Sequence, residues 1–334
     1  MKTAVLLVNL GSPNSSSFWD MRRYLKQFLT DKRVIEWPRF LWYPILFGIV
    51  LTLRPWRSGK NYQRIWHKES NLSPLLYYSF QQASKLQECF KEQEVLVACA
   101  MRYGAPSLEK AVKELMEKGV QRILLFPLYP QYASSTTGSV CEAFLREIAQ
   151  YRTIPALRTV PSFPAHGAYI DAIAQSIRDH LAQLNNTPEK IIVSFHGLPQ
   201  SYIEKGEIYR RECEETFAAL KKNLNFEEGR LILAFQSRFG PEEWLQPYIS
   251  QCLQQLGQEG VKSVSVIAPG FIADCVETLD EIARELKEDF ERAGGEFFSY
   301  IPCLNDSKMA IKMLETLTKE ELSGWYSQSA PIDK

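Results

Sequence analysis

The sequence predicts an α/β protein made of two similar doubly wound domains, each with a four-stranded parallel sheet flanked by helices, and a cleft between the domains. Short apolar runs bounded by Gly, Pro or polar residues alternate with amphipathic stretches along the whole chain. This alternation is typical of parallel sheets with right-handed crossovers. The length of 334 residues also favours about two domains over one.

Eight strands are predicted, four in each half of the chain. They are expected at residues 4–10, 95–101, 122–128, 156–162, 190–196, 230–237, 263–269 and 296–302. Helices are expected at 75–90, 107–118, 141–149, 169–184 and 278–293. The second-half strands begin 40, 33 and 33 residues apart, and the first half matches this spacing if a long insert separates its first two strands.

The predicted domains follow from this spacing. The first is residues 1–165, with an apolar insert at about 31–73, and the second is residues 166–305. A C-terminal helix and a polar tail are expected at 306–334. In doubly wound sheets ligands bind beyond the carboxyl ends of the strands, so we expect the functional residues there.

Composition excludes several classes of protein. Thirty-nine basic residues balance thirty-nine acidic ones, whereas a nucleic-acid binder usually carries a basic excess or stripe. The 45% hydrophobic and 23% charged residues are ordinary for a globular chain. Seven cysteines lie at least ten residues apart with no C-x-x-C pair, which predicts reduced thiols in a cytoplasmic protein.

Two apolar segments need an explanation. The run at residues 4–8 is interrupted by Asn9 and a turn, too early for a signal peptide, and is predicted as the first strand. The run at residues 40–53 is bracketed by Arg39 and Arg54. Because a bilayer span takes about 20 apolar residues, this segment is expected to lie on a surface or to line a pocket.

His196 is the most informative single residue. It ends a predicted buried strand and is followed by Gly-Leu-Pro. From there its imidazole can ligate a metal or move protons, or it can be a core histidine satisfied by the backbone. No strand end carries G-x-G-x-x-G, a Walker P-loop or G-x-S-x-G, so dinucleotide, NTP and serine hydrolase sites lack their fingerprints.

Carboxylates and arginines accompany His196. Glu277 opens a predicted helix whose acidic residues, at positions 274, 277, 281, 285 and 288, are expected on one face. A solvated face is the simpler interpretation for Glu285 and Glu288, whereas a neutral imidazole with Glu277 would suit ferrous iron. The guanidinium forks of Arg54, Arg57 and Arg102 suit a flat ligand with acidic tails, or are solvated at the surface.

Six motifs in order resemble the ferrochelatases, the terminal enzymes of haem synthesis. They are LLVNLGSP (6–13), RYLKQFLTD (23–31), LYPQYASSTTG (128–138), SFHGLP (194–199), FQSRFG (235–240) and PGFIADCVETL (269–279). The resemblance covers roughly residues 3–315 and is strongest to the protoporphyrin-using Gram-negative type. It implies the chelatase fold, two Rossmann-like domains around a porphyrin cleft. It also implies a lyase that inserts Fe²⁺ into protoporphyrin IX, releasing two protons, without ATP or a redox cofactor.

The resemblance also assigns roles. His196 falls on the catalytic proton acceptor, Glu277 on the essential carboxylate that assists it or guides the iron, and both are metal contacts. Glu281 and Glu285 fall on an acidic path behind them. The implied porphyrin contacts are Leu10, Arg54, Arg57, Arg102, Tyr103, Ser237, Trp244 and Phe271.

Departures from the family pattern lead to further expectations. Some relatives hold a [2Fe-2S] cluster through cysteines, but Ser134 stands at one such position and no cysteine follows Cys303, so no cluster is predicted. Cys275 stands where other members often carry a second histidine. The apolar run at 40–53 is expected to rest on the inner leaflet, which would make the protein peripheral at the cytoplasmic membrane.

Two other functions remain open from the sequence. One is a non-catalytic tetrapyrrole or haem carrier, which would keep an apolar pocket but would not need both His196 and Glu277. The other is a chelatase for another metal or tetrapyrrole, although such sites favour more histidines than the four found here.

Overall fold

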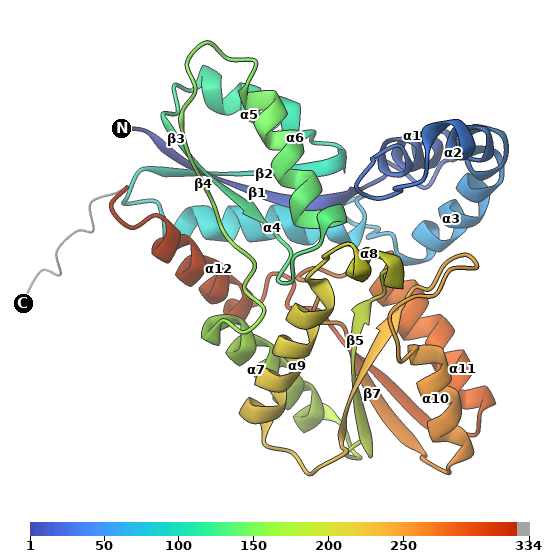
Figure 1. Cartoon of the computed structure of the whole chain (residues 1–334). Helices are drawn as coiled ribbons and strands as arrows, with labels where there is room; N and C mark the ends of the chain where they lie inside the picture. The colour runs from blue at the N-terminus through green and yellow to red at the C-terminus, as the bar shows by residue number, and fades with distance from the viewer. Residues whose placement is uncertain (326–334) are drawn as a thin grey trace, which may run out of the picture. The chain divides into compact units, whose positions relative to one another are not determined.

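The computed structural model describes residues 1–325, which form two compact units (Figure 1). Unit 1 holds Met1–Tyr129, Ser134–Pro161 and the chain from Asp306 onward, and unit 2 holds Pro130–Ala133 and Ser162–Asn305. The chain therefore passes between the units at 129–130, 133–134, 161–162 and 305–306. The predicted polar tail lies largely outside the described residues.

Unit 1 is built on a parallel sheet with strand order β2-β1-β3-β4. The strands are β1 (Thr3–Ser12), β2 (Val95–Gly104), β3 (Arg122–Pro127) and β4 (Ala156–Thr159). β1 pairs with β2 on one side and β3 on the other, and its residues are nearly all buried. A continuous apolar run is what a parallel strand covered on both faces requires.

Helices cover both faces of this sheet. The even-numbered side chains of β1 pack against α5 (Leu108–Glu117) and α6 (Ser139–Ile148) in one core cluster. Another helix, α4 (Pro74–Cys89), contacts β1 and β2 and also α12 (Lys308–Glu321), which runs beside it in Figure 1. The predicted C-terminal helix thus belongs to unit 1.

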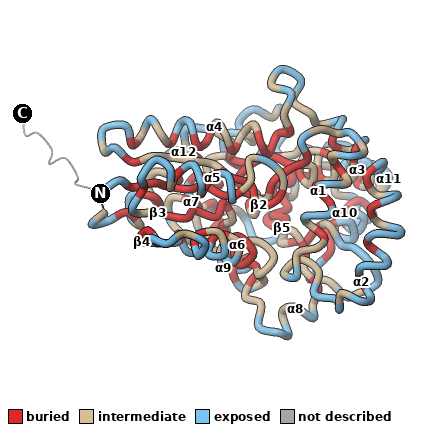
Figure 2. Tube along the Cα trace, turned by 90° about the horizontal axis from the view of Figure 1, so that it is seen from above, coloured by how far each residue is buried: buried red, intermediate tan, exposed pale blue. Residues whose placement is uncertain are grey.

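The insert after β1 is helical. It contains α1 (Phe18–Leu29), α2 (Arg39–Ile45), the π-helix η1 (Leu46–Val50) and α3 (Leu51–Ile65). The predicted apolar segment spans α2, η1 and the start of α3. Trp42 and Leu46 face inward, but most of α2 is exposed, as Figure 2 shows.

Unit 2 repeats the plan, with strand order β6-β5-β7-β8. The strands are β5 (Lys190–His196), β6 (Leu231–Gln236), β7 (Ser263–Ile267) and β8 (Phe297–Ile301). One core cluster joins the sheet to α10 (Ile249–Gln258), the π-helix η3 (Glu277–Leu286) and α11 (Lys287–Arg292). The remaining helices are α7 (Gly167–Gln183), α8 (Gln200–Glu204) and α9 (Tyr209–Leu224), and in unit 1 the short π-helix η2 (Ser134–Gly138) precedes α6.

The structure confirms the two four-stranded parallel sheets and all eight predicted strands, with ends that differ by up to three residues. One predicted helix differs in kind. The segment predicted at 278–293 is a π-helix over Glu277–Leu286 and an α-helix only from Lys287. A π-helix has i→i+5 hydrogen bonds and is often found at functional sites.

Candidate active site

His196 ends β5, and the following turn fixes its ring. Its Nδ1 lies 2.7 Å from the carbonyl oxygen of Gly197. A carbonyl can only accept, so Nδ1 carries a proton, and in the neutral ring the lone pair lies on Nε2. The indole of Trp244 and the ring of Phe271 lie with centroids 6.4 and 6.5 Å from the imidazole. The ring is therefore a base held among aromatic side chains.

Glu277 is the first residue of η3 and is linked to β6. Its backbone carbonyl accepts a hydrogen bond of 3.3 Å from Nε2 of Gln236, and Gln236 is the register partner of His196 on the neighbouring strand. The structure thus brings His196, Glu277, Trp244 and Phe271 to one end of the unit 2 sheet. Parallel strands place their carboxyl ends at the same edge.

Glu281 follows Glu277 along η3. Its Oε2 accepts a hydrogen bond of 2.6 Å from Oγ of Ser237. Burial, together with the nearby charges of Glu277 and Glu285, raises the pKa of Glu281 to about 7 despite the hydrogen bonds from Ser237. A carboxyl with this pKa can take up or release a proton near neutral pH.

The expectation that one acidic face begins at position 274 is wrong for Asp274, whereas Glu285 is solvated, as the simpler interpretation expected. Asp274 precedes the helix and is buried, where it accepts hydrogen bonds from Thr278, Tyr300 and Asn305. Glu285 lies at the surface, where it accepts a hydrogen bond of 2.7 Å from Arg284. The one-face prediction assumed α-helical winding from position 274 onward.

Cys275 lies beside Glu277 in the same segment. Burial raises the pKa of its thiol well above the ordinary value, and the carboxylate of Glu277 adds to the effect. The thiol is therefore a neutral neighbour of Glu277, and all seven cysteines of the chain are free.

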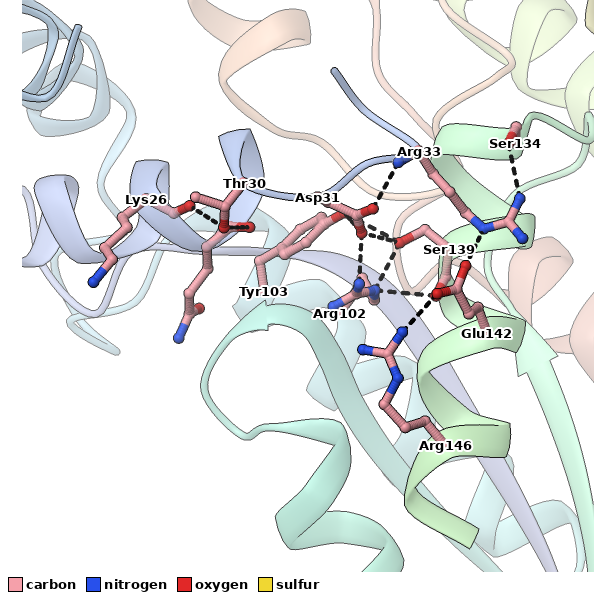
Figure 3. A network of polar contacts seen from close by, with 11 residues as sticks. Lys26, Thr30, Asp31, Arg33, Arg102, Tyr103, Ser134, Ser139, Glu142 and Arg146 are labelled. Carbon is pink, nitrogen blue, oxygen red and sulfur yellow. Dashed lines mark hydrogen bonds and ion pairs between the residues drawn. The ribbon is translucent and has the colours of Figure 1, made fainter. Parts of the chain in front are cut away.

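Two predicted porphyrin contacts of unit 1 belong to a polar network centred on Asp31 (Figure 3). Oδ2 of Asp31 accepts hydrogen bonds from Arg102 Nη2 at 2.5 Å, Tyr103 Oη at 2.7 Å and Ser139 Oγ at 2.6 Å. Oδ1 accepts from the Arg33 amide at 2.8 Å. The guanidinium of Arg102 is thus paired within the unit.

The network keeps Asp31 ionised. Burial by itself would raise its pKa, but the hydrogen bonds from Ser139, the Arg33 amide and Tyr103, with the charge of Arg102, outweigh burial and lower the pKa. This anionic centre joins the start of the insert to the end of β2 and the start of α6.

The other predicted contacts of unit 1 lie elsewhere. Leu10 is half-buried near the end of β1. On α3, Arg54 is half-buried and Arg57 is exposed.

Sequence reasoning did not single out Asp31 or Gln236. Asp31 closes the RYLKQFLTD motif and Gln236 lies in FQSRFG, so both stood within quoted motifs. A buried polar side chain needs hydrogen-bond partners, but the partners of Asp31 lie up to 108 residues away, and no local pattern names them.

Among residues 1–325, no group of three or more His, Cys, Asp or Glu side chains is arranged to hold a metal ion. Within the same range no helix combines the length and apolarity needed to cross a membrane.

Two units of four parallel strands, with an imidazole at one strand end and an acidic π-helix beside it, define the chelatase fold. The fold is similar to that of SirB from Bacillus subtilis with Fe³⁺, with a TM-score of 0.57 and 11% identity over 97% of this chain and 98% of that one. A sirohydrochlorin chelatase SirB from Bacillus subtilis subspecies spizizenii in complex with cobalt gives a TM-score of 0.51 and 12% identity over 96% of each chain.

The sequence comparisons identify the family. The ferrochelatase family model matches residues 2–322. Proteins named ferrochelatase from Brucella canis and Brucella abortus are each 52% identical over 325 residues, which cover 97% of this chain and 92% of theirs. The chain belongs to the ferrochelatase family.

Proposed function

We propose that this chain inserts ferrous iron into protoporphyrin IX to form protohaem, the last step of haem biosynthesis. Membership of the ferrochelatase family over nearly the whole chain is the observation that carries this function. The chain is accordingly an enzyme of the lyase class, with Fe²⁺ and protoporphyrin as its substrates.

His196 is the proton acceptor of the proposed reaction. Porphyrin metallation requires the loss of two pyrrole protons, and because Nδ1–H donates to Gly197, Nε2 is the nitrogen at which the neutral ring can accept one. Glu277, held at the start of η3, supplies the second base or guides the iron. Glu281, with a pKa of about 7, can receive a proton in turn.

The contacts to the porphyrin remain those implied by the family resemblance. Arg54 and Arg57 supply guanidinium forks for the propionates, whereas Arg102 is engaged by Asp31 and acts in this proposal as a structural cation. Ser237 contacts Glu281 in the structure, so a propionate would compete with that carboxylate for the hydroxyl. Leu10, Tyr103, Trp244 and Phe271 are the remaining porphyrin contacts that the resemblance implies.

The test is anaerobic Fe²⁺ insertion by the purified protein, with protoporphyrin IX and coproporphyrin III offered separately and the Soret band followed. We expect turnover of protoporphyrin and its loss in His196→Ala, with porphyrin binding retained. His180→Ala is the matched control, because His180 is half-buried in the same unit and bonds Ser299. Porphyrin binding without turnover by the wild type would instead indicate a carrier.

We also propose that the enzyme carries no [2Fe-2S] cluster. Ser134, at the position of a cluster cysteine in some relatives, accepts a hydrogen bond of 3.0 Å from Arg33. The purified protein should show no iron–sulfur absorbance between the Soret region and the red. Such absorbance together with stoichiometric acid-labile sulfide would overturn the proposal.

The insert is the surface that we propose rests on the cytoplasmic face of the membrane. Of the 15 large apolar side chains that are exposed in the described chain, 10 lie between Trp19 and Trp56. Arg22, Arg23 and Lys26 line an open pocket there with Trp19 and Phe47. Exposed aromatic residues beside cations suit an anionic bilayer surface.

Flotation with liposomes tests this proposal. Wild-type protein should float with vesicles that contain phosphatidylglycerol and should do so less after Phe40→Ser, because Phe40 is 77% exposed. The matched control is Phe239→Ser, since Phe239 is exposed in unit 2. Wild-type protein that stays entirely in the soluble fraction would refute membrane contact.

A further inference from the structure

Gln236 lies beside His196 at the end of the unit 2 sheet. It is the last residue of β6 and aligns with His196, the last residue of β5. Only 2% of Gln236 is exposed, so its amide must find its partners inside the protein. None of the roles proposed above uses it.

Three hydrogen bonds join Gln236 to its surroundings besides those of the strand pairing. Its backbone carbonyl accepts a hydrogen bond of 2.8 Å from the amide of Gly197, the residue after the catalytic histidine. Its Oε1 accepts a hydrogen bond of 2.8 Å from Oγ of Ser194, which is fully buried on β5. Its Nε2 donates 3.3 Å to the carbonyl of Glu277. Because that carbonyl can only accept, the orientation of the amide is fixed.

The contact with Glu277 lies at the start of η3, where Thr278 also bonds Asp274. The N-cap residue of η3, Val276, makes no side-chain cap hydrogen bond, and the Gln236 amide holds the carbonyl of the first residue, Glu277. Ser237, which directly follows β6, adopts a left-handed φ of 65° and donates a hydrogen bond to Glu281. Two consecutive residues therefore hold η3 at points four residues apart.

We propose that Gln236 is a positioning residue for iron insertion: its backbone holds the His196 turn, and its side chain holds the first residue of η3. The Gln236 side chain and backbone together then link the imidazole turn to the residue that carries the Glu277 carboxylate. Two groups that act on one metal ion or one proton must be held to within a fraction of an ångström, and a misplacement of about 1 Å can cost about 100-fold in rate. This inference rests on the proposed function.

The test replaces Gln236 by Leu, which has similar volume and no amide. We expect kcat for Fe²⁺ insertion to fall about 10- to 100-fold. The Kd for protoporphyrin, measured by fluorescence, should stay within about twofold, because Gln236 acts through Glu277 and not on the porphyrin. This split between kcat and binding separates positioning from a general loss of structure.

Gln87→Leu is the matched control. The Gln87 amide also joins two elements. Its Nε2 donates a hydrogen bond of 2.9 Å to the Val95 carbonyl, and its Oε1 accepts one of 2.7 Å from the Val97 amide. It lies in unit 1 between α4 and β2. This variant should lose a similar amount of thermal stability and keep the wild-type kcat.

Two milder variants cover the case in which Gln236→Leu does not fold. Gln236→Met has a similar length but neither donates to Glu277 nor accepts from Ser194, so kcat should fall as for Leu. Ser194→Ala removes only the contact that orients the amide and should lower kcat less.

The inference is overturned if folded Gln236 variants keep kcat within about twofold of wild type, if Gln87→Leu loses as much kcat, or if the loss lies only in KM. A wild-type protein that does not insert iron at all would refute the proposed function instead.

Discussion

Replacing Asp31 by Ala should destabilise unit 1 strongly. The carboxylate accepts four hydrogen bonds, from Arg102, Tyr103, Ser139 and the Arg33 amide. Deleting one partner of a buried ion pair costs about 3–5 kcal/mol. The Arg102 side chain is 21% exposed, so water recovers part of this loss, and we expect the free energy of unfolding to fall by about 3 kcal/mol.

The expected loss depends on pH in a defined direction. The folded state lowers the pKa of Asp31 below its ordinary value of 3.8. A carboxyl with a lowered pKa contributes stability that is fully present above its unfolded pKa and is lost as pH falls through the folded pKa. The difference between wild type and Asp31→Ala should therefore be constant from about pH 5 to pH 8 and shrink below about pH 4.

Urea unfolding followed by tryptophan fluorescence measures this difference, because six of the seven tryptophans lie in unit 1. The control is Glu114→Ala, whose carboxylate forms an exposed pair of 3.9 Å with Lys110 and should change stability by less than about 0.5 kcal/mol. A loss below about 1 kcal/mol in Asp31→Ala, or an undiminished loss at pH 3, would refute the reasoning.

Two further predictions concern unit 2. The pKa of Glu281 is raised to about 7 in the folded state, so the wild-type free energy of unfolding falls as pH rises from about 4.5 to about 7. Relative to wild type, the free energy of unfolding of Glu281→Gln, measured in urea, should therefore increase by about 3 kcal/mol between pH 4 and pH 8. A difference that does not change with pH would contradict this. Gly197→Ala puts a Cβ 2.9 Å from the Gln236 carbonyl oxygen, which should cost about 1–3 kcal/mol and lower kcat about tenfold or more. Gly167→Ala, where a Cβ meets nothing within 4 Å, should change neither quantity, and equal effects of the two substitutions would count against the crowding argument.

The strands were predictable because a buried strand requires a local run of apolar residues, which the sequence shows directly. The segment 190–196 is mostly apolar before His196, with Ile, Ile, Val and Phe, and it forms β5 with the bounds predicted. A parallel strand buried on both faces needs such a run, wherever its neighbours come from. Local composition also marked the insert. Residues 40–53 are mostly apolar and were expected to lie on a surface or to line a pocket, and many of their large side chains are exposed in the structure.

The winding of the helix after Glu277 was not predictable. Apolar residues at 282, 286 and 290 repeat every four residues, a spacing compatible with either α or π winding. Contacts from Gln236 and Ser237, at Glu277 and Glu281, accompany the π form, and these residues lie more than 40 positions away along the chain.

The sequence by itself determined the two parallel sheets, the family and the residue types available for proton and metal chemistry. Only the tertiary structure decided which polar groups pair. It engaged Arg102 with Asp31, 71 residues away, fixed the tautomer of His196 through the Gly197 carbonyl, and tied Glu277 to Gln236. The physical reason is that burial follows from local apolar pattern, whereas a hydrogen bond depends on distance and direction between groups that only folding brings together.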